Sequence, residues 1–100
     1  MIFITQLIYI NKGEEKVFDE FESVAIPLIS KYNGKLLFRV RPNPDHYIEH
    51  TMETPYEIHL VEFETEDDFE NFKVDKEREK ILHLKQRSVK ATLMIKGNRL

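Results

Sequence analysis

Residues 27–41 read PLISKYNGKLLFRVR, and this stretch joins the end of a helix to a strand. Asn33 and Gly34 are typical of a helix end, because both tolerate the left-handed backbone of a C-terminal cap. From residue 35 onward apolar and other side chains alternate, which predicts a strand with one face toward a core. We expect the covered face to hold Leu36, Phe38 and Val40, and the other face to hold Leu37, Arg39 and Arg41.

Upstream of this stretch, apolar residues recur at helical spacing between Asn11 and Asn33. Asn11 is expected to cap this helix, with Glu14 completing a capping box. Pro27 lies inside the helix and should kink it on the solvent side. Residues 2–10 form a short apolar run, which predicts a buried strand.

Downstream, residues 42–55 contain three prolines and no helical stripe. We expect a long loop there, with at most a short strand near residues 47–50. A third strand follows at residues 56–64. Thr65 is the expected cap of a second helix, whose pattern falters near residues 74–75 and predicts a break or a second short helix.

Residues 89–96 alternate again and predict the last strand, with Val89, Ala91, Leu93 and Ile95 on the covered face. The element order is therefore β-α-β-β-α-β. This order predicts one α+β domain over residues 1–100, with a ferredoxin-like, four-stranded antiparallel sheet and two helices on one face.

The uncovered face of this sheet should be polar if it met water. The first strand, however, is mostly apolar on either face, and Leu37 and Met94 are expected to join its outward set. A second copy stacked face to face would bury this patch and form a barrel-like homodimer. The alternative is a monomer whose loop 42–55 folds over the open face.

Composition excludes several classes of function. The net charge is −3 at pH 7 and lysines alternate with glutamates, so the clustered positive surface of a nucleic-acid-binding protein is missing. The chain has no cysteine, which excludes disulfides, thiolate metal sites and cysteine nucleophiles. The first residues lack a basic leader and are too short to span a bilayer, so we predict a cytoplasmic protein with no membrane partner.

Three segments resemble an uncharacterised family, the domain of unknown function 1330. Residues 27–37, PLISKYNGKLL, resemble its helix-to-strand segment of proline, apolar pair, basic residue, aromatic residue, two small turn residues, basic residue and apolar pair. Residues 59–65 resemble its strand that ends in Glu-Phe before an acidic helix start, and residues 89–97 are similar to its closing strand. The chain departs from the family at the longer segment 42–55 and at Asn33, where the family usually has a second glycine.

This resemblance implies a dimeric α/β-barrel fold. The wider superfamily includes cofactor-free monooxygenases, lactone isomerases and haem-degrading enzymes. The family itself has no assured activity, and the absence of tryptophan argues against haem degradation, since those relatives commonly rely on one.

Gln6, Arg39 and Glu62 are the predicted polar site. The third strand of a ferredoxin-like sheet lies between the first and second, which would place Glu62 between Gln6 and Arg39 on the open face. Arg39 would then bind a carboxylate or phenolate, and Glu62 would move a proton if burial raised its pKa. The alternative is an ion pair that only satisfies itself inside the dimer interface.

His46 and His50 lie four residues apart, which is a metal-like spacing only on a helix, and the neighbouring prolines disfavour a helix there. We therefore predict no metal site. Tyr47 and His50 are instead predicted binding residues at the mouth of a pocket, and loop 42–55 is a candidate lid. His59 is expected to be a half-buried strand residue rather than a base.

The sequence thus predicts a homodimer that binds a small organic molecule between sheet and helices, with no cofactor. It leaves three functions open. The protein is a cofactor-free enzyme acting on an activated ring or acid, a non-catalytic binding or regulatory module, or a purely structural dimer.

Overall fold

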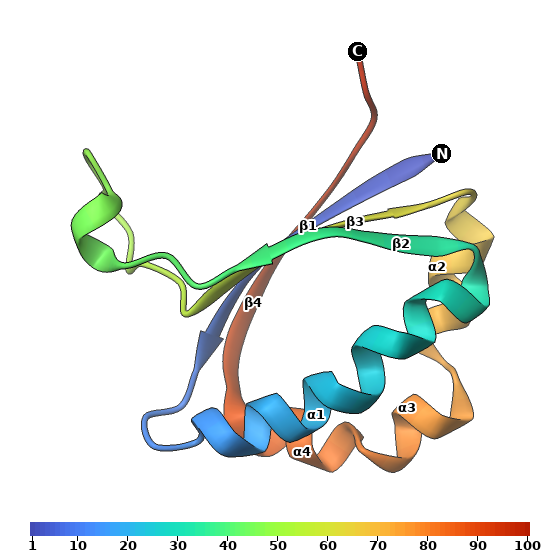
Figure 1. Cartoon of the computed structure of the whole chain (residues 1–100), viewed down its shortest axis with the longest axis horizontal. Coiled ribbons are helices and arrows are strands. Elements are labelled where there is room, and N and C mark those ends of the chain that lie inside the picture. Colours follow the sequence, from blue (N-terminus) through green and yellow to red (C-terminus); the bar gives the residue numbers. More distant parts are fainter.

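In the computed structural model, which describes residues 1–100, all four helices lie on the same side of an antiparallel sheet (Figure 1). The strands are β1 (Ile2–Ile10), β2 (Gly34–Val40), β3 (Glu57–Phe63) and β4 (Val89–Gly97). The helices are α1 (Glu15–Leu28), α2 (Glu66–Lys73), α3 (Lys76–Lys80) and α4 (Leu82–Ser88), with 3-10 turns η1 (Ile29–Tyr32) and η2 (Pro44–His46). The strand order β2-β3-β1-β4 confirms the predicted ferredoxin-like α+β fold.

Two of the three expected helix boundaries are confirmed. Asn33 adopts the left-handed conformation, with φ of 56°, and ends the α1–η1 segment. The Thr65 hydroxyl accepts a hydrogen bond from the Asp68 amide at 3.1 Å and caps α2. The capping box at Asn11 is wrong, because the Asn11 side chain donates to the Arg87 carbonyl at 2.9 Å instead and α1 starts without a side-chain cap.

The expected break near residues 74–75 is present, and Asp75 organises it. Its carboxylate accepts hydrogen bonds from the amides of Glu77 and Arg78 and so caps α3. The same carboxylate accepts hydrogen bonds from Tyr32 and from Lys31, and these contacts hold the pKa of Asp75 well below its usual range. Asp75 therefore ties the end of the first helical segment to the start of α3.

The core lies between the sheet and the helical layer. Phe63 on β3 packs against Phe69 and Phe72 of α2, with ring centroids 5.4 and 5.6 Å apart. Ile4 of β1 and Ile29 of η1 belong to the same buried cluster. This cluster lies at the end of the fold where α2 packs against the sheet.

The predicted faces of β2 are only half right, because the strand contains a β-bulge at Leu37. Leu36 lies opposite Val61 on the covered face, but the register then shifts, so that Phe38 lies opposite Leu60 and Arg39 opposite His59. One extra residue reverses every side chain beyond it. Phe38 and Val40 consequently lie on the open face, and Arg39 and Arg41 point toward the helices.

A second register shift changes the faces of β4. It falls between Tyr9 and Ile10 of β1. Of the residues predicted to be covered, Val89 lies on the helix side, but Ala91, Leu93 and Ile95 belong to the open face with Tyr9, Leu7 and Thr5. Met94, predicted to be outward, lies opposite Gln6 on the covered face instead.

The open face is therefore even more apolar than the sequence predicts. Phe38 is 47% exposed, Leu93 is 44% exposed and Ile95 is 51% exposed. Residues 42–55 extend beyond the end of the sheet (Figure 1) and form the expected long loop, with the turn η2 and no strand at 47–50. The loop covers only one end of the open face, where the Tyr9 hydroxyl donates to the Glu53 carbonyl at 2.7 Å.

Gly34 is the position at which β2 approaches the core most closely. A Cβ atom there would lie 2.6 Å from Phe63 Cε1 and 2.7 Å from Ile29 Cγ2, inside the packed core. Gly34→Ala is therefore expected to lower the free energy of unfolding by about 1–3 kcal/mol, as overpacking does in cores. Urea denaturation measures it. Gly97→Ala is the matched control, since a Cβ there meets no atom within 4 Å, and equal stability losses in both variants would refute the packing argument.

Candidate functional site

A cavity of about 50 Å³ lies between the sheet and the helical layer. One water molecule needs roughly 10–15 Å³ of such space, so the cavity has room for a few waters or one small organic group. Its wall is mostly apolar. The polar residues that line it are Gln6, Glu22, His59, Arg78, Lys85 and Thr92.

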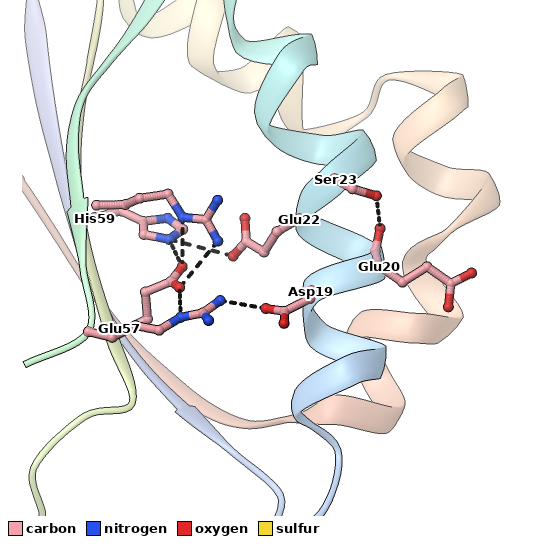
Figure 2. A network of polar contacts seen from close by, with 8 residues as sticks. Asp19, Glu20, Glu22, Ser23, Glu57 and His59 are labelled. Atoms are coloured by element: carbon pink, nitrogen blue, oxygen red, sulfur yellow. Dashed lines mark hydrogen bonds and ion pairs between the residues drawn. The ribbon is translucent and has the colours of Figure 1, made fainter.

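Glu22 is the unusual residue of this wall. It lies on the inner face of α1, is only 4% exposed, and forms no hydrogen bond within the protein. Its carboxyl group points from the helix toward His59 on β3 (Figure 2), and Glu22 Oε1 lies 3.6 Å from His59 Nε2. A buried carboxyl without a hydrogen bond is costly unless it is protonated or meets a ligand.

Glu57, by contrast, is fully satisfied. Arg39 approaches its two carboxylate oxygens at 3.2 and 3.3 Å, and Arg41 Nε donates to it at 2.7 Å. His59 Nε2 also contacts Glu57. Because the ionised carboxylate of Glu57 can only accept, His59 Nε2 is the donor in this hydrogen bond.

The pKa values of Glu22 and Glu57 are shifted in opposite directions. Burial raises the pKa of Glu22 to about 7, and the charge of Glu57 adds to this increase, although His59 and the two arginines partly oppose it. Burial would also raise the pKa of Glu57, but hydrogen bonds from His59, Arg41 and Arg39 outweigh it and hold the pKa at about 2. Near neutral pH, Glu57 is therefore ionised while Glu22 readily gains or loses a proton, as a general acid or base must.

Glu22, Glu57 and His59 also have the donor atoms of a metal site, since one ligand atom from each lies within 4.8 Å of the others. Two guanidinium groups, however, already neutralise Glu57. A divalent cation bound here would lie close to Arg39 and Arg41, and their repulsion disfavours it. The arrangement fits proton transfer better than metal binding.

The structure separates the three residues of the predicted polar site. Gln6 lines the cavity, and Arg39 holds Glu57 on the same side of the sheet. Glu62 lies opposite Phe3 and Lys35 on the open face, because β3 buries Glu57, His59, Val61 and Phe63 on the other side. The expected contact of Glu62 with Gln6 and Arg39 is therefore wrong. Gln6 lies opposite His59 in the β1–β3 register, on the face away from Glu62, and the bulge in β2 turns Arg39 to that same face.

Tyr47 and His50 lie together but away from this cavity. Their rings meet edge to face with centroids 5.8 Å apart, and they line a separate hollow with Leu7 and Ile58 of the open face. The sheet stands between this hollow and the cavity. The two residues are therefore not at the mouth of the cavity, and their role in binding stays a prediction.

The site predicted from the sequence does not include Glu22, although the sequence contains a signal for it. It follows Phe18 by four residues and precedes Ala25 by three, so it interrupts the apolar stripe of α1. His59 was expected to be half-buried, but it is 4% exposed. A charged residue inside an apolar helical stripe is the feature of the sequence that indicates this site.

Comparison with known proteins supports the fold. No family model and no curated protein matches the chain. A protein of unknown function from Rhodopseudomonas palustris has a similar structure, with a TM-score of 0.83 at 13% identity, covering 99% of this chain and 82% of that one. An uncharacterised NIPSNAP domain protein from Burkholderia xenovorans gives a TM-score of 0.73 at 8% identity, covering 100% of this chain and 95% of the other.

A third similar structure is described as a dimeric protein of unknown function with a ferredoxin-like fold, from Bacteroides fragilis. Its TM-score is 0.70 at 13% identity, covering 98% of this chain and 95% of that one. These likenesses confirm the fold, while membership of the domain of unknown function 1330 family is not confirmed. No helix of the chain combines the length and the apolar character that a membrane crossing needs.

The raised pKa of Glu22 makes stability depend on pH. Its pKa is about 7 in the folded protein against an ordinary 4.5, so between these values the folded state holds a proton that the unfolded state has lost. The free energy of unfolding should therefore fall as pH rises across this window, by up to about 3 kcal/mol. Urea denaturation from pH 4.5 to 7 measures it.

Glu22→Gln should remove this part of the pH dependence and make the protein more stable than the parent at neutral pH. Glu20→Gln, on the exposed face of the same helix, is the control and should leave the slope unchanged. Parallel curves for the parent and Glu22→Gln would show that Glu22 does not carry the proton.

Proposed function

We propose that this protein is a homodimer that binds a small organic molecule in the cavity between sheet and helices, and that it performs acid–base chemistry there without a cofactor. The observation that carries the proposal is Glu22, a buried carboxyl that lines the cavity without a hydrogen-bond partner and has a pKa of about 7. Perturbed carboxyls in cavities are typical of functional sites.

In this proposal Glu22 removes a proton from a carbon next to a carbonyl, or from a hydroxyl group, and later returns it. His59 Nε2 lies 3.6 Å from Glu22 Oε1 and would favour the ionised form of Glu22 electrostatically, while its hydrogen bond goes to Glu57. Glu57 holds the His59 ring, and Arg39 and Arg41 hold Glu57. Arg39 is then a positioning residue, and no role in proton transfer remains for Glu62.

A non-catalytic binding module is the second candidate. The observation that favours it is the complete pairing of Glu57 with Arg39, Arg41 and His59, which is what a structural ion-pair network looks like. In that case Glu22 would only bind the ligand. The two candidates differ in whether a bound molecule exchanges a proton with Glu22.

The dimer is supported by the apolar open face and by the dimeric neighbour from Bacteroides fragilis. Large exposed apolar patches mark interfaces, and a second copy brings an identical patch. We propose that the open faces of two copies pack together. We also propose that the protein acts in the cytoplasm, where a cysteine-free chain needs no oxidising environment.

Phe38 and Leu93 test the dimer, because both are exposed on the open face. Phe38→Asp and Leu93→Asp should each convert the dimer to a monomer, since the interface would bury an unpaired charge. Native mass spectrometry measures the oligomer. Val74→Asp is the control, because Val74 is 64% exposed between α2 and α3, away from the sheet. A monomeric parent protein would contradict the proposal.

Proton exchange tests the chemistry. The protein should accelerate exchange of the protons next to the carbonyl of 2-oxobutyrate or of its neutral analogue butanone in D₂O, followed by ¹H NMR. Glu22→Gln should slow the catalysed exchange by roughly 100-fold, as loss of a general base does. Glu20→Gln should retain the parent rate.

Binding of these compounds without any acceleration would favour the non-catalytic module. Equal acceleration by the parent and Glu22→Gln would show that another group removes the proton, and would refute the role of Glu22.

A further inference from the structure

We propose that Arg78 of α3 and Lys85 of α4 form an anion subsite in the cavity, and that the small molecule bound there carries a carboxylate. This proposal specifies the class of ligand for the proposed function. It rests on the proposed function, which places the reacting group of the ligand beside Glu22. It comes from two cations that line the same cavity and have no carboxylate partner.

Arg78 is held in place without being neutralised. Its guanidinium lies over the rings of Phe21 and Phe72, 5.8 and 5.3 Å from their centroids. One terminal nitrogen donates to the Lys73 carbonyl at 3.1 Å. Its Nε is buried and has no hydrogen-bond partner. The group is thus oriented by apolar packing and one carbonyl, and it keeps an unused donor.

Lys85 is the second cation and makes neither a hydrogen bond nor an ion pair. Burial lowers its pKa, and the positive charge of Arg78 lowers it further, while the charge of Glu22 partly opposes this decrease. Burial likewise lowers the pKa of Arg78, although the charges of Glu22 and Asp75 partly oppose this decrease. Two half-buried cations that repel each other are unfavourable unless a negative charge joins them.

The buried carboxylates of Glu57 and Asp75 are already paired with cations. Arg39 and Arg41 pair with Glu57, and Lys31 pairs with Asp75. Glu22 also lines the cavity, but its raised pKa leaves it substantially protonated near neutral pH, so it does not fully neutralise the two cations. An anionic ligand would supply the missing charge.

The other residues that line the cavity indicate the size and polarity of the rest of the ligand. Gln6 and Thr92 offer neutral polar groups, and Ile4, Phe18 and Val61 offer apolar surface. With about 50 Å³ available, the cavity suits a short carbon chain or a small ring bearing one carboxylate. A carboxylate bound at Arg78 and Lys85 would place the apolar body of such a compound toward β1 and β3, where Glu22 and His59 also reach.

Butyrate and butyramide test this inference, because they have the same shape and differ in charge. Isothermal titration calorimetry should show butyrate binding at least roughly tenfold more tightly, as expected when a charge-assisted hydrogen bond is lost. Lys85→Met should weaken butyrate by roughly tenfold or more and leave butyramide unchanged. Lys80→Met, an exposed lysine on α3 that has no ion pair, is the matched control and should change neither affinity.

Equal affinity for butyrate and butyramide, no butyrate binding, or an unchanged butyrate affinity in Lys85→Met would each overturn the anion subsite. Circular dichroism checks that the variant is folded, and Lys85→Arg should restore butyrate binding if charge is what matters. The experiments distinguish failure of the anion subsite from failure of the proposed function. Glu22-dependent exchange of neutral butanone would uphold the chemistry without the subsite, and butyrate binding without any exchange would uphold the subsite alone.

Discussion

The arrangement of this protein depends on one extra residue in β2. The bulge at Leu37 shifts the register between Leu36 and Phe38. Beyond it, Arg39 faces the helices and reaches Glu57, while Phe38 faces outward and adds to the apolar open face. A regular strand would have placed the arginine on the open face and the phenylalanine in the core. The charged network and the proposed dimer surface thus have the same origin.

Turning the arginines inward makes it possible to bury two acidic residues side by side. Glu57 forms ion pairs with Arg39 and Arg41 and stays ionised. The carboxyl group of Glu22 is removed from water but accepts no hydrogen bond from a cation, so burial raises its pKa. Two neighbouring carboxyls with pKa values driven apart give one permanent charge and one exchangeable proton, which is the arrangement that acid–base chemistry requires.

Much of the fold could be predicted from local pattern. The helix end at Asn33, the cap at Thr65 and the break at Val74 each depend on a few neighbouring residues, and the structure contains all three. The predicted cap at Asn11 is wrong because the Asn11 side chain donates a hydrogen bond to the Arg87 carbonyl, 76 positions away in the chain. The expected contact of Gln6, Arg39 and Glu62 is also absent, since the faces on which these residues lie follow from the pairing of β1 and β2 with β3 and not from the alternation within each strand.

By itself the sequence determined the element order, the ferredoxin-like fold and the excess of apolar side chains that leaves one face of the sheet uncovered. These follow from periodicity and composition, which are properties of each segment alone. Only the tertiary structure decided that Glu22, Glu57 and His59 meet, and that Arg78 and Lys85 line the same cavity. The reason is physical: a bulge shifts strand register by one residue without changing any local pattern, and cavity walls are assembled from elements that are distant in the chain.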